Sequence, residues 1–256
     1  MIRNILSIII ILCLAFSSRA QVVSSNMENI SRTASAYELK FTSSKPSWEE
    51  INAAFENANT PFYPIDHAQW PDRNTGYNPF SAFRIAYSDA NREIYIQYKV
   101  AEKCVRATFG EDVVAQPWTD TCLEFFCIPG NDQMYYNLEL NCIGIGILGS
   151  GVDRKDRVRA EKETLALIRR HSTLGSEPFG NREANGTLIE YTMTVAIPYE
   201  AYFRSEVKPL KGRSIRANFY HCGDNTAYPH YMSWNPILLE KPNFHTPEFF
   251  GSVEFK

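Results

Sequence analysis

Apolar and polar side chains alternate along two neighbouring runs, residues 121–128 and 135–143, which a Pro-Gly-Asn-Asp sequence separates. Such alternation is typical of strands with one face in a core, and the break between the runs is typical of a hairpin turn. In the first run Leu123 and Phe125 should share the core face, while Glu124 points to the opposite face. The sequence therefore predicts an antiparallel hairpin that gathers carboxylates, carboxamides and aromatic rings on one side.

The same alternation predicts further strands at residues 81–87, 93–100, 104–108, 187–197, 214–220 and 251–255. Helical patterns are fewer. A capping box that begins at Ser47 predicts a short helix through about residue 56, and Pro198 begins a single helical turn. Residues 161–170 carry a weaker helical pattern. Many short strands with frequent turns predict an all-β fold, an antiparallel and jelly-roll-like β-sandwich with a few short helices.

The first 20 residues are typical of a signal peptide. Arg3 precedes an apolar run over residues 6–16, and small residues follow at 17–20. The apolar run is too short for a membrane-spanning helix. We therefore expect cleavage after Ala20, export to the periplasm or the cell exterior without membrane insertion, and a single domain over residues 21–256.

Charge and cysteine content restrict the classes of partner. The chain carries 26 Lys and Arg against 29 Asp and Glu, a net charge of −3. Nucleic acids and anionic membranes favour clustered cations, so neither is expected as a partner. Five cysteines follow the signal peptide, an odd number that leaves at least one free thiol. Their apolar surroundings predict buried small side chains, and no Cys-x-x-Cys or His-x₃-His spacing indicates a zinc site.

The polar face of the predicted hairpin has two interpretations: a surface for a sugar or another polar ligand, or an ordinary solvated sheet face. A glycoside hydrolase would instead need two carboxylates, about 5–5.5 Å apart for retention or about 6.5–9.5 Å apart for inversion. Candidates for such a pair are Asp120, Glu124, Glu139 and Asp224. Glu124 and Glu139 are placed on adjacent strands, so this alternative stays open.

Seven motifs occur in a fixed order along the chain. They are Trp118-x-Asp120-x-x-x-Glu124-Phe-Phe, Asn137-x-Glu139-x-Asn141, Ile197-Pro198-Tyr199, Arg216-Ala-Asn-Phe-Tyr220, Cys222-Gly-Asp224, Pro229-His-Tyr-x-Ser-Trp-Asn-Pro236 and Phe244-His-x-Pro-Glu-Phe-Phe-Gly251. Together they resemble the carbohydrate-binding module family 9-like domains of exported Bacteroidetes-type proteins, over about residues 37–256.

This resemblance implies a β-sandwich that binds poly- or oligosaccharides and acts with glycoside hydrolases in polysaccharide breakdown. Family members hold the end sugars of plant glycans such as xylan and cellulose between two tryptophans. By position, Trp118 and Trp234 match that pair, and Glu124 matches a carboxylate that binds sugar hydroxyls. The family also carries structural calcium. Its ligands have no assigned match in this sequence, so calcium stays open and no other cofactor is expected.

Sugar recognition needs both kinds of side chain that the sequence offers. Pyranose C–H faces stack on indoles for about 1 kcal/mol each, as aromatic contacts do, and sugar hydroxyls need paired donors and acceptors. Besides Glu124, candidates for these polar contacts are Asn141, Arg154 and Asn218. Each has a structural alternative, such as a sheet-face or loop-bracing role. Three hypotheses result: a non-catalytic sugar-binding protein, a hydrolase, and a sandwich that has lost its sugar site.

Overall fold

The computed structural model describes residues 31–256 except 71, 74 and 75, so the predicted signal peptide lies outside the described residues. Arg32–Lys256 form one compact unit. Within the part of the chain that the structure describes, no helix is both long and apolar enough to cross a membrane.

The strands, in chain order, are β1 (Thr33–Glu38), β2 (Tyr63–Pro64), β3 (Phe80–Ser88), β4 (Glu93–Glu102), β5 (Cys104–Ala107), β6 (Cys122–Ile128), β7 (Tyr135–Asn141), β8 (Gly146–Gly151), β9 (Val158–Arg159), β10 (Arg169–Ser172), β11 (Phe179–Glu183), β12 (Ile189–Pro198), β13 (Ser214–Cys222), β14 (Tyr231–Ser233) and β15 (Gly251–Phe255). The helices are α2 (Trp48–Asn57) and α3 (Lys162–Leu167), with 3₁₀ turns η1 (Pro117–Thr119), η2 (Tyr199–Ala201) and η3 (Pro247–Phe249).

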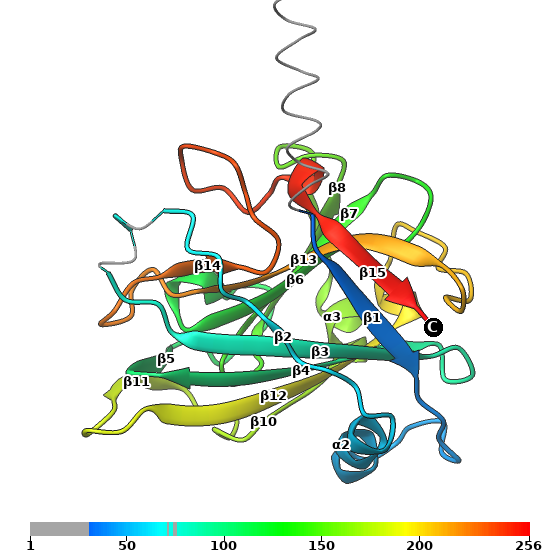
Figure 1. The fold of residues 1–256 in the computed structure, drawn as a ribbon, viewed down its shortest axis with the longest axis horizontal. Helices are drawn as coiled ribbons and strands as arrows, with labels where there is room; N and C mark the ends of the chain where they lie inside the picture. Colours follow the sequence, from blue (N-terminus) through cyan, green and yellow to red (C-terminus); the bar gives the residue numbers. More distant parts are fainter. Residues whose placement is uncertain (1–30, 71, 74–75) are drawn as a thin grey trace, which may run out of the picture. The chain divides into compact units, whose positions relative to one another are not determined.

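Two β-layers pack face to face and share one strand (Figure 1). The first layer has the order β10-β12-β4-β3, and the second has the order β15-β13-β6-β7-β8-β9. Strand β1 runs parallel to β15 along its first part and parallel to β3 at its end, so it is hydrogen-bonded to both layers. All other pairings in the two layers are antiparallel. The predicted all-β sandwich is confirmed.

The core lies between the two layers, where the alternation places it. Leu123 and Phe125 of β6 are buried in this core together with Leu138 of β7, as the sequence predicts. At its centre Phe83 of the first layer stacks on Phe219 of the second, with ring centroids 3.4 Å apart. Each layer therefore has one face committed to the core and one face left for another element.

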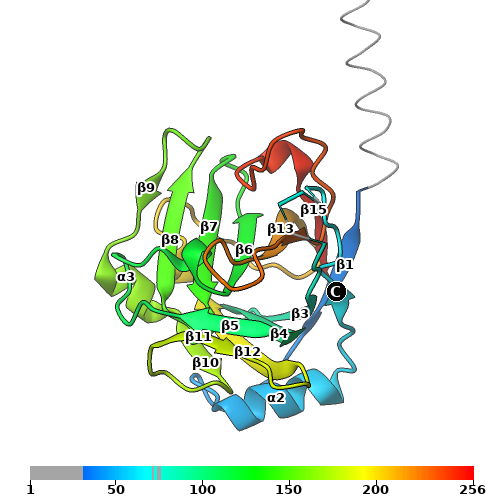
Figure 2. The same ribbon diagram turned by 90° about the vertical axis from the view of Figure 1, so that its left-hand side faces the viewer.

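Helix α2 covers the outer face of the first layer (Figure 2). The predicted capping box is present: Glu50 N donates to Ser47 Oγ, and Ser47 N donates to the Glu50 carboxylate. On the apolar side of the helix, Ile51 and Phe55 pack against Tyr95 of β4. A cavity lies on the outer face of the second layer.

Candidate functional site

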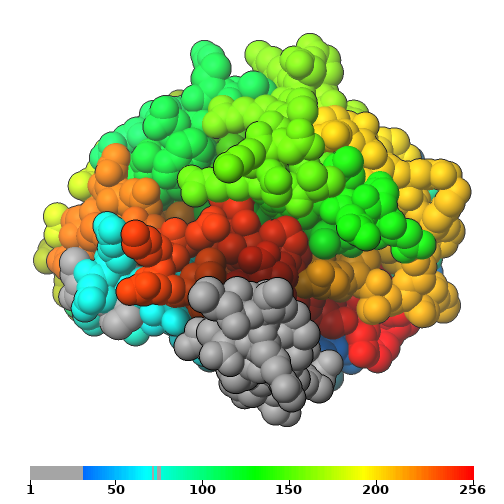
Figure 3. Space-filling model, turned by 90° about the horizontal axis from the view of Figure 1, so that it is seen from above, coloured from blue at the N-terminus to red at the C-terminus, as the bar shows by residue number. Residues whose placement is uncertain are grey.

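A cavity of about 800 Å³ lies on the outer face of the second layer. Strands β6, β7 and β8 supply its floor, and η1 and the loops at residues 152–157, 223–231 and 241–245 supply its walls. Figure 3 shows this side of the molecule, with the late loops in orange and red beside the yellow-green segment around β8 and β9. The volume is within the range of about 300–1,000 Å³ that small-molecule sites occupy.

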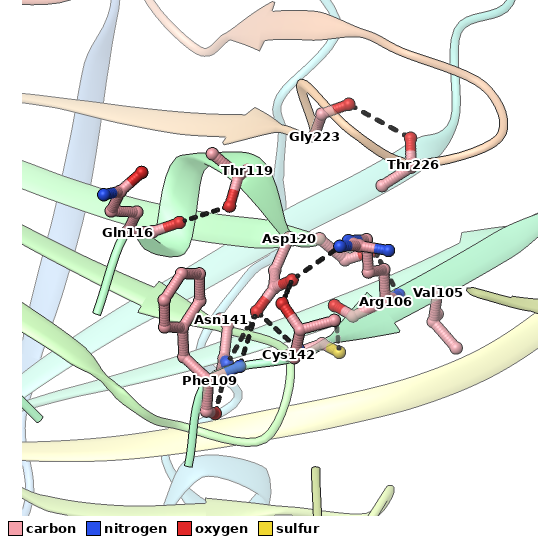
Figure 4. A network of polar contacts seen from close by, with 12 residues as sticks. Val105, Arg106, Phe109, Gln116, Thr119, Asp120, Asn141, Cys142, Gly223 and Thr226 are labelled. Atoms are coloured by element: carbon pink, nitrogen blue, oxygen red, sulfur yellow. Dashed lines mark hydrogen bonds and ion pairs between the residues drawn. The ribbon is translucent and has the colours of Figure 1, made fainter. Parts of the chain in front are cut away.

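Trp118 is the tryptophan that lines the cavity and is only partly buried. It belongs to η1, which Asp120 ties to the rest of the fold (Figure 4). The Asp120 carboxylate accepts hydrogen bonds from Thr108 N and Oγ1, each 2.8 Å long, and pairs with Arg106 Nε at 3.3 Å. In addition, Asp224 N donates to the Trp118 carbonyl at 2.9 Å. These bonds hold the indole at the cavity wall.

Two buried carboxyl groups, Glu124 and Glu139, form part of the floor. They lie opposite each other in the β6–β7 register. Burial raises the pKa of Glu124 well above its usual range, and the carboxyl of Glu139 raises it further. Burial also raises the pKa of Glu139, while a hydrogen bond from Asn137 Nδ2, 2.8 Å long, acts against that rise. Glu124 Oε1 accepts from the Cys222 thiol at 3.1 Å. The floor thus places two buried carboxyl groups, both with raised pKa values, next to each other in the cavity.

Aromatic side chains from the late loops complete the wall. Phe244 lines the cavity and stacks on Tyr220 of β13, with ring centroids 4.2 Å apart and planes inclined by 7°. His245 follows it, and its Nδ1 lies 3.3 Å from the Tyr135 hydroxyl. Burial, and then the charges of two nearby arginines, lower the pKa of His245 to about 3. The His245 ring is therefore neutral at physiological pH and able to exchange hydrogen bonds with a neutral ligand.

Basic side chains outnumber acidic ones around the cavity. The cations that line it are Arg73, Arg154, Arg157, Arg159 and Lys241, and the acids are Glu124, Glu139 and Asp224. Burial and raised pKa values favour the neutral forms of the two glutamates, so these acids neutralise the cations only weakly. The cations therefore provide donors that can contact the hydroxyl or carboxylate groups of a ligand.

Sequence and structure comparisons identify the family. A family model described as carbohydrate-binding family 9 matches residues 49–255. The chain belongs to carbohydrate-binding family 9. The resemblance inferred from the seven motifs is thereby confirmed, and carbohydrate binding is assigned at the level of the family. No match was found among curated proteins.

Solved structures agree with this assignment. A crystal structure from Bacteroides uniformis ATCC 8492, named provisionally as a carbohydrate-binding protein, has 37% identity, covers 88% of this chain and 100% of its own, and has a TM-score of 0.81. Two structures of a family 9 module from Caldicellulosiruptor kristjanssonii share the fold at lower identity. The glucose complex has 10% identity, a TM-score of 0.54 and coverage of 88% and 96%, and the cellotriose complex has 9%, 0.50, 88% and 94%.

The structure of this family 9 chain brings three of the six predicted ligand residues to the cavity: Trp118, Glu124 and Arg154. The predicted pairing of Trp118 with Trp234 is wrong in this structure. Trp234 is 1% exposed and packs in the core, edge-on to Phe83 and Phe219. Trp234 lies between the layers because the segment after β14 returns to the interior. Its indole is therefore not available to a ligand.

The two predicted asparagines are also absent from the cavity lining, and each makes a bracing contact instead. Asn141 is fully buried, donates to Asp120 Oδ2 at 3.1 Å and accepts from Ile145 N at 2.9 Å. Asn218 donates to the Asn235 carbonyl at 3.1 Å and accepts from Asn235 N at 2.8 Å. Both side chains hydrogen-bond backbone groups of loops that cover the sheet face. This bracing role is the structural alternative that the sequence left open.

Several cavity residues were not predicted as ligands. Among them are Arg73, Asn137, Arg157, Arg159, Tyr231, Lys241, Phe244 and His245, besides Glu139 and Asp224, which were considered only as hydrolase candidates. For Asn137 the signal was present, since it alternates with the core residues of β7 in the same way as Glu139. The loop residues carry no periodic signal, and only their contacts in three dimensions place them at the cavity.

Two groups of described side chains could hold a metal ion: Glu102, His221 and His230, and Cys122, Glu124 and Cys222. Calcium prefers oxygen ligands in sets of six to eight. Neither group fits that preference, because both rely on nitrogen or sulfur donors. The calcium implied by the family resemblance is therefore not matched to either of these groups.

Proposed function

We propose that this protein is a non-catalytic carbohydrate-binding module whose ligand occupies the cavity on the second layer. One observation carries the proposal: a partly exposed indole, Trp118, adjoins a floor of buried carboxyl and carboxamide groups within one cavity. An indole stacks on the C–H face of a pyranose, and paired polar groups bind its hydroxyl edge. Membership of carbohydrate-binding family 9 supports the same conclusion.

The proposed ligand is a glucose-containing oligosaccharide of the plant type, bound at a chain end. The family 9 neighbours in complex with glucose and cellotriose support the glucose part of this proposal. The signal-peptide pattern of residues 1–20 supports export to the periplasm or cell exterior, where glycoside hydrolases would release or consume such chains.

A calorimetric titration of the purified protein with cellotriose and xylotriose tests the proposal. We expect saturable binding that weakens by about 2–13-fold in Trp118→Ala, which corresponds to the loss of about 0.5–1.5 kcal/mol of stacking. Trp48→Ala is the matched control, because Trp48 is also partly buried but lies on α2, outside the cavity. Equal weakening in both variants, or no binding of any tested sugar, would contradict the site assignment. Reduction of the sugar's terminal aldehyde should abolish binding if the reducing end of the chain is recognised.

A glycoside hydrolase remains the second candidate because Glu124 and Glu139 face each other across β6 and β7 in one cavity. Their raised pKa values resemble those of a general acid beside a second carboxyl group. Chromatography of the titrated samples separates the two functions. Products that appear with the natural protein but not with Glu124→Gln would favour catalysis, and unchanged sugar would favour binding alone.

A further inference from the structure

A second cluster of polar side chains lies between the two layers, on the opposite face of β13 from the sugar cavity. It consists of Glu102 at the end of β4, His221 of β13 and His230 from the loop before β14, each 0% exposed. One donor atom from each side chain lies within 4.8 Å of the other two. Glu102 Oε1 is 3.7 Å from His221 Nε2, and the two imidazole centroids are 4.4 Å apart.

Most polar atoms of this cluster have no hydrogen-bond partner among the described residues. The unpartnered atoms are Glu102 Oε2, both ring nitrogens of His221, and His230 Nε2. Buried polar atoms nearly always have a partner, so four orphans at one point require an explanation. The cluster retains two outward contacts, from the Tyr191 hydroxyl to Glu102 Oε1 at 3.4 Å and between His230 Nδ1 and the Tyr228 carbonyl at 2.9 Å.

The contact at His230 fixes which ring nitrogen is available. A carbonyl only accepts, so Nδ1 must carry the proton and donate to Tyr228. Nε2 then keeps its lone pair, and this is the atom left without a partner inside the cluster. Metal-ligating histidines typically show this arrangement, with one nitrogen on the metal and the other donating to a carbonyl or carboxylate.

We propose that Glu102, His221 and His230 bind a zinc ion. Two imidazoles and one carboxylate form a donor set that zinc uses, whereas calcium and magnesium prefer oxygen alone. The ion would occupy the unpartnered donors of all three side chains at once. It would also supply the cation that Glu102 lacks, since among the described residues this carboxylate pairs with no Lys or Arg.

The protonation states agree with metal binding. Burial lowers the pKa of His221 to about 3 and that of His230 to about 4, so both imidazoles are neutral at physiological pH, the form that ligates metals. Burial raises the pKa of Glu102 to about 7, which the charge of a bound ion would reverse. Because Glu102 belongs to the first layer and His221 to the second, the ion would join the two layers and stabilise the sandwich.

The other group of described side chains that could hold a metal ion, Cys122, Glu124 and Cys222, has no comparable set of unpartnered donor atoms. Glu124 Oε1 already accepts from the thiols of Cys122 and Cys222 at 3.8 and 3.1 Å, and Glu124 lines the sugar cavity. That group belongs to the site described above. The histidine cluster was not predicted because its members are far apart in the sequence and make no local spacing pattern.

Zinc binding by the full chain tests the proposal. The protein is stripped with a chelator under mild denaturation and refolded with or without one equivalent of zinc. We expect one zinc per chain by mass spectrometry and a higher Tm for the loaded form. In competition with a chromophoric chelator, Glu102→Gln and His230→Gln should bind zinc at least about 100-fold more weakly. His171→Gln is the control, since His171 is exposed on β10 away from the cluster, and it should bind as the natural protein does.

Cobalt loading of the natural protein gives a test that does not depend on how well the variants fold. Nitrogen and oxygen ligation should produce visible absorption bands without a sulfur-to-cobalt charge-transfer band. A strong charge-transfer band would place the metal at Cys122 and Cys222 and overturn the assignment. The assignment would also be overturned by a natural protein that binds no zinc, or by folded cluster variants that bind zinc as tightly as His171→Gln.

Discussion

The two tryptophans that the sequence could not distinguish should give opposite phenotypes when each is replaced by alanine. Trp234 is 1% exposed, and its ring lies 5.5 Å from that of Phe83 and 5.9 Å from that of Phe219. Removing a buried tryptophan from a core typically costs about 3–5 kcal/mol. For a domain of this size each kcal/mol lowers Tm by about 2–4 °C. We therefore expect Trp234→Ala to lower Tm by roughly 6–20 °C.

Trp118→Ala should instead leave the fold intact and weaken sugar binding. Its ring is partly exposed at the cavity wall, and the bonds that hold η1 come from the backbone and from Asp120 rather than from the indole. Tm should fall by less than about 4 °C, as for a change outside the core. Thermal unfolding by circular dichroism and calorimetric titration with cellotriose measure the two effects separately. The reasoning is refuted if Trp234→Ala keeps the natural Tm, or if Trp118→Ala loses as much stability as Trp234→Ala.

Three further changes test the supports of the cavity. In Gly149→Ala the new Cβ would lie 2.5 Å from Asn137 Oδ1, so Asn137 must move and we expect several-fold weaker cellotriose binding by calorimetry. Asp120→Asn removes the negative charge that pairs with Arg106 and that accepts from Thr108 N, and should lower the free energy of unfolding in urea by about 2–4 kcal/mol. It should also weaken cellotriose binding, because Asp120 helps to hold the turn that carries Trp118. For His245 the folded pKa of about 3 lies below the unfolded value of 6.5, so its stabilisation is complete above pH 6.5 and is lost as the pH falls toward 3. Between pH 6.5 and 5 the natural protein should lose up to about 2 kcal/mol through this group, and His245→Gln should lose less over the same interval.

Alternation along the strands predicted the floor of the cavity but not its walls. Leu123 and Glu124 are neighbours in sequence, and the period of two places one in the core and the other under the cavity. The wall at residues 241–245 has no such period. It is held by tertiary contacts, such as the stacking of Phe244 on Tyr220, that no local pattern encodes.

The two asparagines that do not reach the cavity share one cause. Asn141 and Asn218 do point away from the core, as alternation requires, but loops cover those parts of the sheet face. A polar side chain under a loop satisfies the backbone of that loop, and one beside a cavity remains available to a ligand. The period of a strand fixes the face of each side chain, whereas the covering element depends on residues far away in sequence. Trp234 differs only in that its segment returns to the interior between Phe83 and Phe219.

The two proposed sites lie on opposite faces of strand β13, because successive side chains of a strand point to opposite faces. Cys222 lines the outer cavity and donates to Glu124, while the adjacent His221 lies between the layers, 3.7 Å from Glu102. The same strand is therefore a wall between a solvent-accessible cavity and a closed cluster. Substitutions at these two successive positions should therefore have different effects. Cys222→Ser should change sugar affinity and leave zinc content intact, whereas His221→Gln should lower zinc content and Tm. If both changes altered both properties equally, the two faces of β13 would not be independent, and the division of the molecule into an outer sugar site and an inner metal site would fail.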